Sequence, residues 1–217
     1  MRPIVVVVVG SVVVASVALV AAGCPATTPQ LRAIAHASSA RLLVASDARL
    51  AFVDGADVRV IAPPDPNAPP APDAAPVDDA LDELRAPANG AVSAMALGTR
   101  ALAAIEGGRV RVHPYDGSPA VDVVADDAPL AIAALVDGFE WVEAHADGDA
   151  LHLTLVDSDA FGAVRTKTHA TLDAPLPDAE AFGVVVAGHD AIVGIGDALV
   201  KIDRATGDGT VAWHASA

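Results

Sequence analysis

The chain has 217 residues, with 28 acidic and 13 basic side chains and a formal net charge of −15 at pH 7. Nucleic acid and anionic lipid headgroups repel such an acidic surface, which excludes non-specific binding to either. The single cysteine, Cys24, excludes a disulfide or a cysteine metal site within one chain. Aromatic residues make up 3% of the chain. We therefore expect a core of closely packed layers, built mainly from alanine and valine.

The N-terminal segment has the three parts of a secretory signal. Arg2 gives a positive start, residues 4–20 are apolar, and residues 21–23 are small. We expect the apolar part to enter the bilayer as a helix. Residues 4–22 also have about the length of an uncleaved membrane anchor, which stays open as the alternative. Both interpretations predict that residues 25–217 lie outside the cytoplasm.

The end of this segment, the string LVAAGC, resembles the lipobox of bacterial lipoproteins. The resemblance implies cleavage between Gly23 and Cys24, and diacylation of Cys24 as the first residue of the mature protein. Ala21 stands where leucine is usual. Pro25, in place of aspartate, resembles lipoproteins that Gram-negative cells send to the outer membrane. Two or three acyl chains hold a protein firmly, at about 0.8 kcal/mol per buried methylene, so residues 24–30 would form a lipidated tether.

The remaining residues, 31–217, contain a fourfold repeat of apolar strand, polar turn, second strand, Asp- or Gly-rich turn and third strand. The third strand carries a cationic or imidazole side chain between two apolar ones, a period-two pattern typical of a strand with one buried face. The pattern recurs every 41 to 52 residues, in the triplets Val58-Arg59-Val60, Val110-Arg111-Val112, Leu151-His152-Leu153 and Val200-Lys201-Ile202.

A fourth strand is expected in at least three of the repeats, over residues 120–124, 163–171 and 210–214. Four antiparallel strands in each unit of this length are typical of a β-propeller blade. We therefore predict an all-β, β-propeller-like array of about four four-stranded antiparallel blades. A strand over residues 31–37 would close the ring against the last blade. A β-sandwich and a truncated larger propeller are the alternatives.

The last unit, ALVKIDRATGDGTVAW, resembles the blade repeat of quinoprotein-dehydrogenase-like propellers, of the YVTN type. Asp203, Thr206, Gly207 and Trp213 occupy the places of that family's Asp, Thr-Gly turn and Trp. The resemblance implies a propeller fold and no quinone chemistry, so no cofactor is expected.

A proline-rich surface loop is predicted over residues 62–89, because seven of the fourteen residues in 63–76 are proline and proline cannot donate to a strand ladder. The following residues, 78–86, would form one or two helical turns, capped by Asp78 or Asp79. The loop is a stiff spacer or a docking segment for a proline-binding partner.

The candidate chemical groups are few, and no catalytic residue is predicted. His145, His152 and His169 could bind a metal only if they share a face, and their spacing matches no familiar ligand motif, so no metal site is predicted. Acidic turns could hold calcium, but Asp and Gly are also the ordinary residues of hairpin turns. We favour turns for Asp147 with Asp149, Asp157 with Asp159, Asp203 with Asp208, and Gly188-His189-Asp190.

Two strands carry alternating charged side chains, which we expect to be the solvated faces of an outer strand pair with opposite charges across from one another. They are Trp141, Glu143 and His145 on one strand and Arg165, Lys167 and His169 on the other.

These features favour a membrane-anchored extracytoplasmic lipoprotein whose acidic domain is a non-enzymatic scaffold. Its partners would be the membrane, through the lipid, and a protein of the cell envelope, with no nucleic acid. The alternative is a ligand- or metal-binding sensor or an enzyme that uses the central opening of the propeller.

Overall fold

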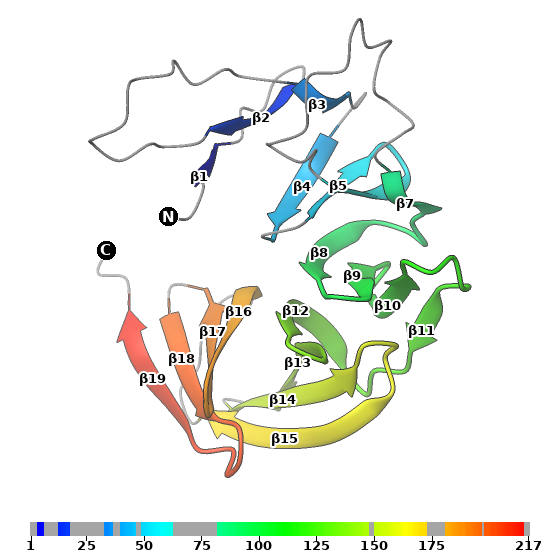
Figure 1. The fold of residues 1–217 in the computed structure, drawn as a ribbon. Coiled ribbons are helices and arrows are strands. Elements are labelled where there is room, and N and C mark those ends of the chain that lie inside the picture. Colours follow the sequence, from blue (N-terminus) through cyan, green and yellow to red (C-terminus); the bar gives the residue numbers. More distant parts are fainter. Residues whose placement is uncertain are drawn as a thin grey trace, which may run out of the picture. The chain divides into compact units, whose positions relative to one another are not determined.

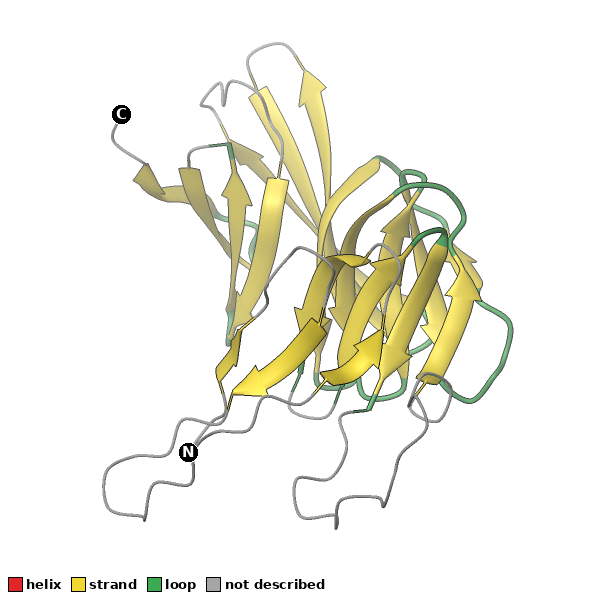
Figure 2. Cartoon of the chain, turned by 90° about the horizontal axis from the view of Figure 1, so that it is seen from above, coloured by secondary structure: helices red, strands yellow, loops and turns green. Residues whose placement is uncertain are grey.

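The computed structural model describes residues 4–6, 13–17, 33–36, 40–46, 49–62, 82–147, 150–172, 181–196 and 198–214. The regular secondary structure in these ranges consists of β-strands, without a helix (Figures 1 and 2). Four four-stranded antiparallel sheets confirm the predicted all-β, β-propeller-like fold. The chain divides into two compact units, Met1–Pro87 and Ala88–Ala217. In the described ranges, none of the segments is a helix with the length and hydropathy needed to cross a membrane.

The first unit begins with a three-stranded sheet of β1 (Ile4–Val6), β2 (Val13–Val17) and β3 (Ala33–His36). The apolar segment predicted as a helix thus contains two paired strands, in keeping with the preference of its β-branched valines for extended backbone. β3 lies within the strand predicted over residues 31–37. It pairs with β2, and closure of the ring by this strand stays a prediction.

The same unit contains a four-stranded meander in the order β4-β5-β6-β7. Its strands are β4 (Ala40–Ala45), β5 (Leu50–Asp54), β6 (Asp57–Ile61) and β7 (Asp82–Pro87).

The strand β7 corrects the prediction of helical turns over residues 78–86 and ends the proline-rich loop before residue 82. Its charged side chains pair across strands. Glu83 accepts a hydrogen bond from Arg49, and Arg85 Nε donates a hydrogen bond to Asp57 at 3.0 Å. These pairs and the backbone ladder to β6 stabilise the strand, and neither is visible in local sequence.

The second unit contains three further four-stranded meanders, each in chain order. The first has β8 (Val92–Leu97), β9 (Ala101–Glu106), β10 (Arg109–Pro114) and β11 (Val121–Val123). The second has β12 (Ala128–Leu135), β13 (Gly138–Asp147), β14 (Ala150–Asp159) and β15 (Val164–Leu172). The third has β16 (Ala181–Ala187), β17 (Asp190–Ile195), β18 (Ala198–Asp203) and β19 (Gly209–His214).

The three sheets of this unit follow one another with their first strands together. β12 contacts both β8 and β16, whereas β11, β15 and β19 form the opposite edges of their sheets (Figure 1). This arrangement is that of successive propeller blades and differs from a two-sheet sandwich.

Two apolar clusters fill the spaces between these sheets. One joins the first and second sheets around the fully buried Phe139 and Trp141. The other joins the second and third sheets with small and branched side chains such as Leu153 and Ile202. Burial of one such side chain contributes about 1.5–3 kcal/mol. The packed faces position the polar groups described next.

Candidate functional site

The three histidines considered for metal binding share one face of the second sheet. His145 pairs with His152 across β13 and β14, and His169 pairs with Thr154 across β15 and β14. The imidazoles of His152 and His169 bond to threonine hydroxyls, with Nδ1 to Oγ1 distances of 3.1 Å to Thr171 and 3.0 Å to Thr154. Within the described ranges, no group of three His, Cys, Asp or Glu side chains could hold a metal ion.

The face of β13 predicted to be solvated is exposed at His145 but buried at Trp141 and Glu143. Trp141 Nε1 donates to Glu143 Oε1 at 2.8 Å, and the backbone amides of Asp126 and Asp127 donate to Glu143 Oε2 at 3.1 and 3.2 Å. Glu143 is therefore a structural acceptor that ties β13 to the segment before β12. The alternation did not predict this burial because it depends on the first sheet, which packs against this part of β13 around Trp141.

The charged side chains of β15 are exposed, as predicted for an outer strand. Lys167 bonds to Asp126, which raises the pKa of Lys167. Arg165 Nη2 donates to the carbonyl of Asp137 at 3.1 Å.

The residues matched to the propeller repeat build the β18–β19 turn. Asp203 Oδ1 accepts from the amides of Ala205 at 2.8 Å and Thr206 at 3.0 Å, and these hydrogen bonds lower the pKa of Asp203. Gly207 has a φ of +79°, and a Cβ there would lie 2.1 Å from the carbonyl oxygen of His169. Glycine is therefore required where this turn meets β15.

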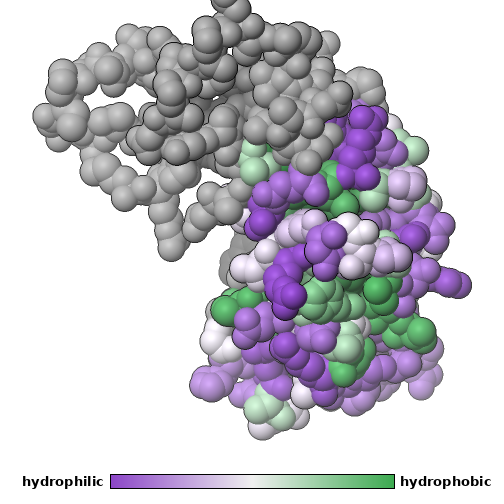
Figure 3. Space-filling view, turned by 45° about the vertical axis from the view of Figure 1, so that its right-hand side comes forward, coloured by the Kyte–Doolittle hydropathy of each residue, from purple (hydrophilic) through white to green (hydrophobic). Residues whose placement is uncertain are grey.

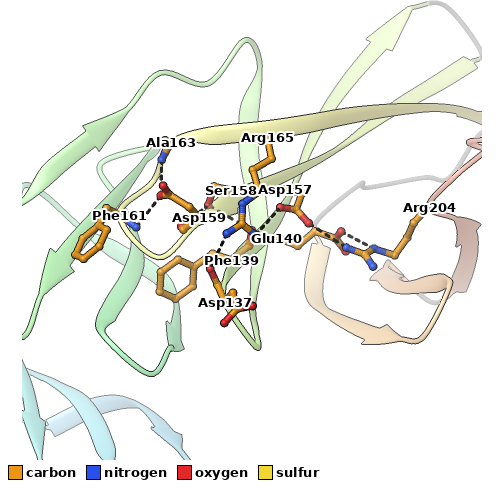
Figure 4. Close-up of polar contacts among 10 residues, drawn as sticks. All are labelled: Asp137, Phe139, Glu140, Asp157, Ser158, Asp159, Phe161, Ala163, Arg165 and Arg204. Carbon is orange, nitrogen blue, oxygen red and sulfur yellow. Dashed lines mark hydrogen bonds and ion pairs between the residues drawn. The ribbon is translucent and has the colours of Figure 1, made fainter.

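Thr206 of the motif and Asp159 of an acidic turn form hydrogen bonds within their own turns. Thr206 Oγ1 donates to Asp208 Oδ2 at 2.9 Å. Asp159 Oδ1 accepts from the amides of Phe161 and Ala163, as expected for a turn residue (Figure 4). The side chain of Trp213, together with Cys24, Asp149 and the proline-rich segment 63–81, lies outside the described residues.

The first sheet of the second unit contains a buried carboxylate–imidazole pair that the sequence did not predict. His113 Nε2 lies 2.6 Å from Glu106 Oε1, and the amide of Asn89 donates to Glu106 Oε2 at 2.7 Å. Burial alone would raise the pKa of Glu106, but the hydrogen bonds from His113 and Asn89 outweigh it and lower that pKa. All the polar atoms of the carboxylate are thereby satisfied.

The cavity of most chemical interest lies between the second and third sheets and has a volume of about 260 Å³. It combines side chains of β13, β14 and β15 with residues of two turns of the third sheet. Its lining comprises Glu140, Leu155, Asp157, Thr166, Thr168, His189, Arg204 and Ala205.

Arg204 crosses from the third sheet to two carboxylates of the second (Figure 4). Its Nε donates to Glu140 Oε2 at 2.7 Å and its Nη2 to Asp157 Oδ2 at 3.3 Å, while Nη1 lies 3.4 Å from the Gly188 carbonyl oxygen. Thr168 Oγ1 donates to the carbonyl oxygen of Arg204 at 2.8 Å. Hydrogen bonds thus fix both the backbone and the guanidinium of Arg204.

The two carboxylates keep unused acceptor capacity. Glu140 Oε1 and Asp157 Oδ1 are buried without a hydrogen bond, although Arg165 Nη1 lies 3.7 Å from Asp157 Oδ1. Burial raises the pKa of Glu140, against the opposing effect of Arg204. Both oxygens are enclosed in the packing between the two sheets. Glu140 and Arg204 carry no sequence signal that singles them out, and Asp157, expected in a turn, lies in strand β14. His189 lies in the turn between β16 and β17, as expected.

No protein-family model matches the sequence. No curated protein matches it either.

Solved structures do resemble the fold. The PorZ surface component of the type-IX secretion system of Porphyromonas gingivalis matches 100% of the chain and 26% of its own length, with a TM-score of 0.53 and 13% identity. A protein of unknown function from Bacteroides caccae matches 78% of the chain and 58% of its own, with a TM-score of 0.48 and 13% identity. Kluyveromyces lactis Hsv2 matches 86% of the chain and 53% of its own length, with a TM-score of 0.47 and 14% identity.

The chain spans between about a quarter and somewhat over half of the length of these three structures. At such low identity the likeness concerns the fold alone.

Proposed function

We propose that the chain is an extracytoplasmic lipoprotein, anchored through acylated Cys24, whose β-propeller-like domain is a non-enzymatic scaffold for a protein of the cell envelope. Pro25 favours the outer membrane as its location. The observation that carries the scaffold proposal is the composition of the three adjoining first strands, β8, β12 and β16.

These strands offer no group for proton transfer or metal binding. Their sequences are VSAMAL, APLAIAAL and AFGVVVA, in which the hydroxyl of Ser93 is the sole side-chain polar group. Catalysis or tight metal binding along these strands would need convergent ionisable side chains. The composition of β8, β12 and β16 therefore does not favour the alternative of a sensor or enzyme at a central opening.

The described surface of the second unit offers apolar side chains to a protein partner. Figure 3 shows hydrophobic areas among hydrophilic ones. The exposed large apolar residues of this unit are Val121, Val124, Val136 and Val164, with 43%, 83%, 84% and 42% of their surface accessible. Apolar contacts with a polar surround are what protein interfaces use.

The anchor is tested by Cys24→Ser, followed by fractionation of the cells and by following the processed chain. We expect the variant to leave the membrane fraction or to accumulate unprocessed, whereas Ala26→Ser, two residues away, should behave as the unaltered chain. Unchanged membrane attachment and processing of Cys24→Ser would contradict the proposal in favour of an uncleaved anchor. Reproducible hydrolytic or redox turnover by the purified chain would contradict the scaffold role.

A further inference from the structure

We propose that Asn89 is a site of spontaneous covalent modification, at which the backbone nitrogen of Gly90 displaces the side-chain amide of Asn89 and leaves an aspartyl or isoaspartyl residue. Both residues belong to the segment 88–91, which precedes β8. Water is the only co-reactant, so the reaction needs no enzyme. This inference does not depend on membrane attachment or on the scaffold proposal.

Both reacting groups are accessible and free of competing hydrogen bonds. Asn89 and Gly90 are exposed and lie in a bend outside the strands. Within the ranges that the structure describes, neither the side-chain amide of Asn89 nor the backbone amide of Gly90 forms a hydrogen bond with another protein group. A backbone amide in a strand ladder would first have to break such a bond. The two groups of this segment therefore meet no such barrier.

The absence of a side chain at residue 90 favours the attack. Gly90 has a φ of +104°, a conformation that glycine adopts without strain. Since Gly90 has no Cβ, nothing at that residue hinders the approach of its nitrogen to Asn89 Cγ. Asn67, the other asparagine of the chain, precedes Ala68 and lacks this advantage.

The reaction balances without an oxidant or a reductant. The Gly90 nitrogen loses its proton to hydroxide and forms a bond to Asn89 Cγ. The bond between Cγ and Nδ2 breaks, and Nδ2 leaves as ammonia after taking a proton from water. The five-membered succinimide then adds one water. Opening at Cγ gives aspartate, and opening at the backbone carbonyl carbon of residue 89 gives isoaspartate, in which the main chain runs through the side chain.

The product alters the surroundings of a buried carboxylate. The backbone amide of Asn89 donates a hydrogen bond to Glu106 Oε2 at 2.7 Å, and Glu106 also bonds to His113. A new carboxylate at residue 89 brings a like charge towards Glu106. Isoaspartate also lengthens the main chain by one carbon, before the point where the Ala91 carbonyl accepts from the amide of Gly107 at 2.8 Å. We therefore expect the modified chain to be less stable.

Peptide mapping by mass spectrometry of the full chain, after incubation at pH 8 and 37 °C, tests this inference. Cleavage after arginine separates Asn89, in residues 86–100, from Asn67, in residues 60–85. We expect the first peptide to exchange NH₂ for OH at least tenfold faster than the second, with isoaspartate among its products. Equal rates, or aspartate without isoaspartate, would overturn the inference.

A synthetic peptide of residues 86–100 shows whether the folded chain permits the reaction. Because both groups are exposed and unbonded, Asn89 in the folded chain should react at no less than about a tenth of the rate in the free peptide. A slower reaction in the folded chain would contradict the inference, since the fold would then protect Asn89.

Asn89→Gln should abolish the mass change in residues 86–100 over the same period, because the longer side chain would have to form a six-membered ring. The side chain at this position is exposed, so the variant should keep the circular dichroism spectrum of the unaltered chain. An undiminished mass change in the variant would refute the assignment to Asn89.

The modified fraction of the unaltered chain has one more negative charge and can be separated by anion exchange. It should unfold at a lower urea concentration than the unmodified fraction. Equal unfolding midpoints would overturn the expected effect on the surroundings of Glu106.

Discussion

Arg204 Nε donates a 2.7 Å hydrogen bond to Glu140 Oε2, which joins the β18–β19 turn to strand β13 of the neighbouring sheet. The two residues are 64 positions apart in the chain. Because Glu140 is buried, this bond connects two packed sheets and is more than a surface ion pair.

Arg204→Met should lower the free energy of unfolding by about 2–4 kcal/mol, because it leaves the buried Glu140 carboxylate without its cation. Urea unfolding followed by circular dichroism measures the change. Lys201→Met is the matched control, since Lys201 pairs with Asp190 at 3.0 Å with half of its side chain exposed, and its loss should cost under about 1 kcal/mol. Equal losses for the two variants would contradict a structural role for the Arg204 bond.

Glu140→Gln should alter the pH dependence of stability. Burial raises the pKa of Glu140 above the usual 4.5, so the folded chain binds this proton more tightly than the unfolded chain. The stability that Glu140 contributes is complete below the unfolded pKa and is lost as pH rises through the folded pKa. Measured by urea unfolding from pH 4 upward, the advantage of the unaltered chain over the variant should shrink as pH rises. A difference in the free energy of unfolding that grows as pH rises would contradict the raised pKa of Glu140.

Glu106→Gln should show the opposite dependence. The hydrogen bonds from His113 and Asn89 lower the pKa of Glu106 below 4.5. Its contribution is therefore present above the unfolded pKa and is lost as pH falls through the folded pKa. The same unfolding series, extended to acid, should show the advantage of the unaltered chain declining below the unfolded pKa. An advantage independent of pH would contradict the lowered pKa.

Gly207→Ala should destabilise the chain by more than about 2 kcal/mol. The added Cβ would lie 2.1 Å from the His169 carbonyl oxygen, at a φ of +79°. Gly188→Ala separates the two effects, because Gly188 also has a positive φ, +66°, but no atom within 4 Å of the added Cβ. It should cost about 1 kcal/mol. Thermal unfolding compares the two, and an equal loss would show that the contact with β15 is unimportant.

The strand order within each sheet was predictable because successive strands of a meander are adjacent and each repeat shows period-two alternation. The triplet at Val110-Arg111-Val112, for example, lies in β10 with its two valines buried and Arg111 half-buried. β7 was missed because DELR carries no apolar alternation and depends on pairing with β6 across the proline-rich loop.

The polar contacts were not predictable from the sequence. Alternation shows that Trp141 and Glu143 share a face, but not that a neighbouring sheet covers that face. The contact of Arg204 with Glu140 depends on how two sheets stack. A single sequence contains no direct signal for such contacts.

Attachment through Cys24 can be measured by mass spectrometry of the mature N-terminus after purification from membranes. We expect the first residue to be Cys24 and to carry diacylglycerol. A mature chain that retains the apolar residues 4–22, with an unmodified Cys24, would contradict it.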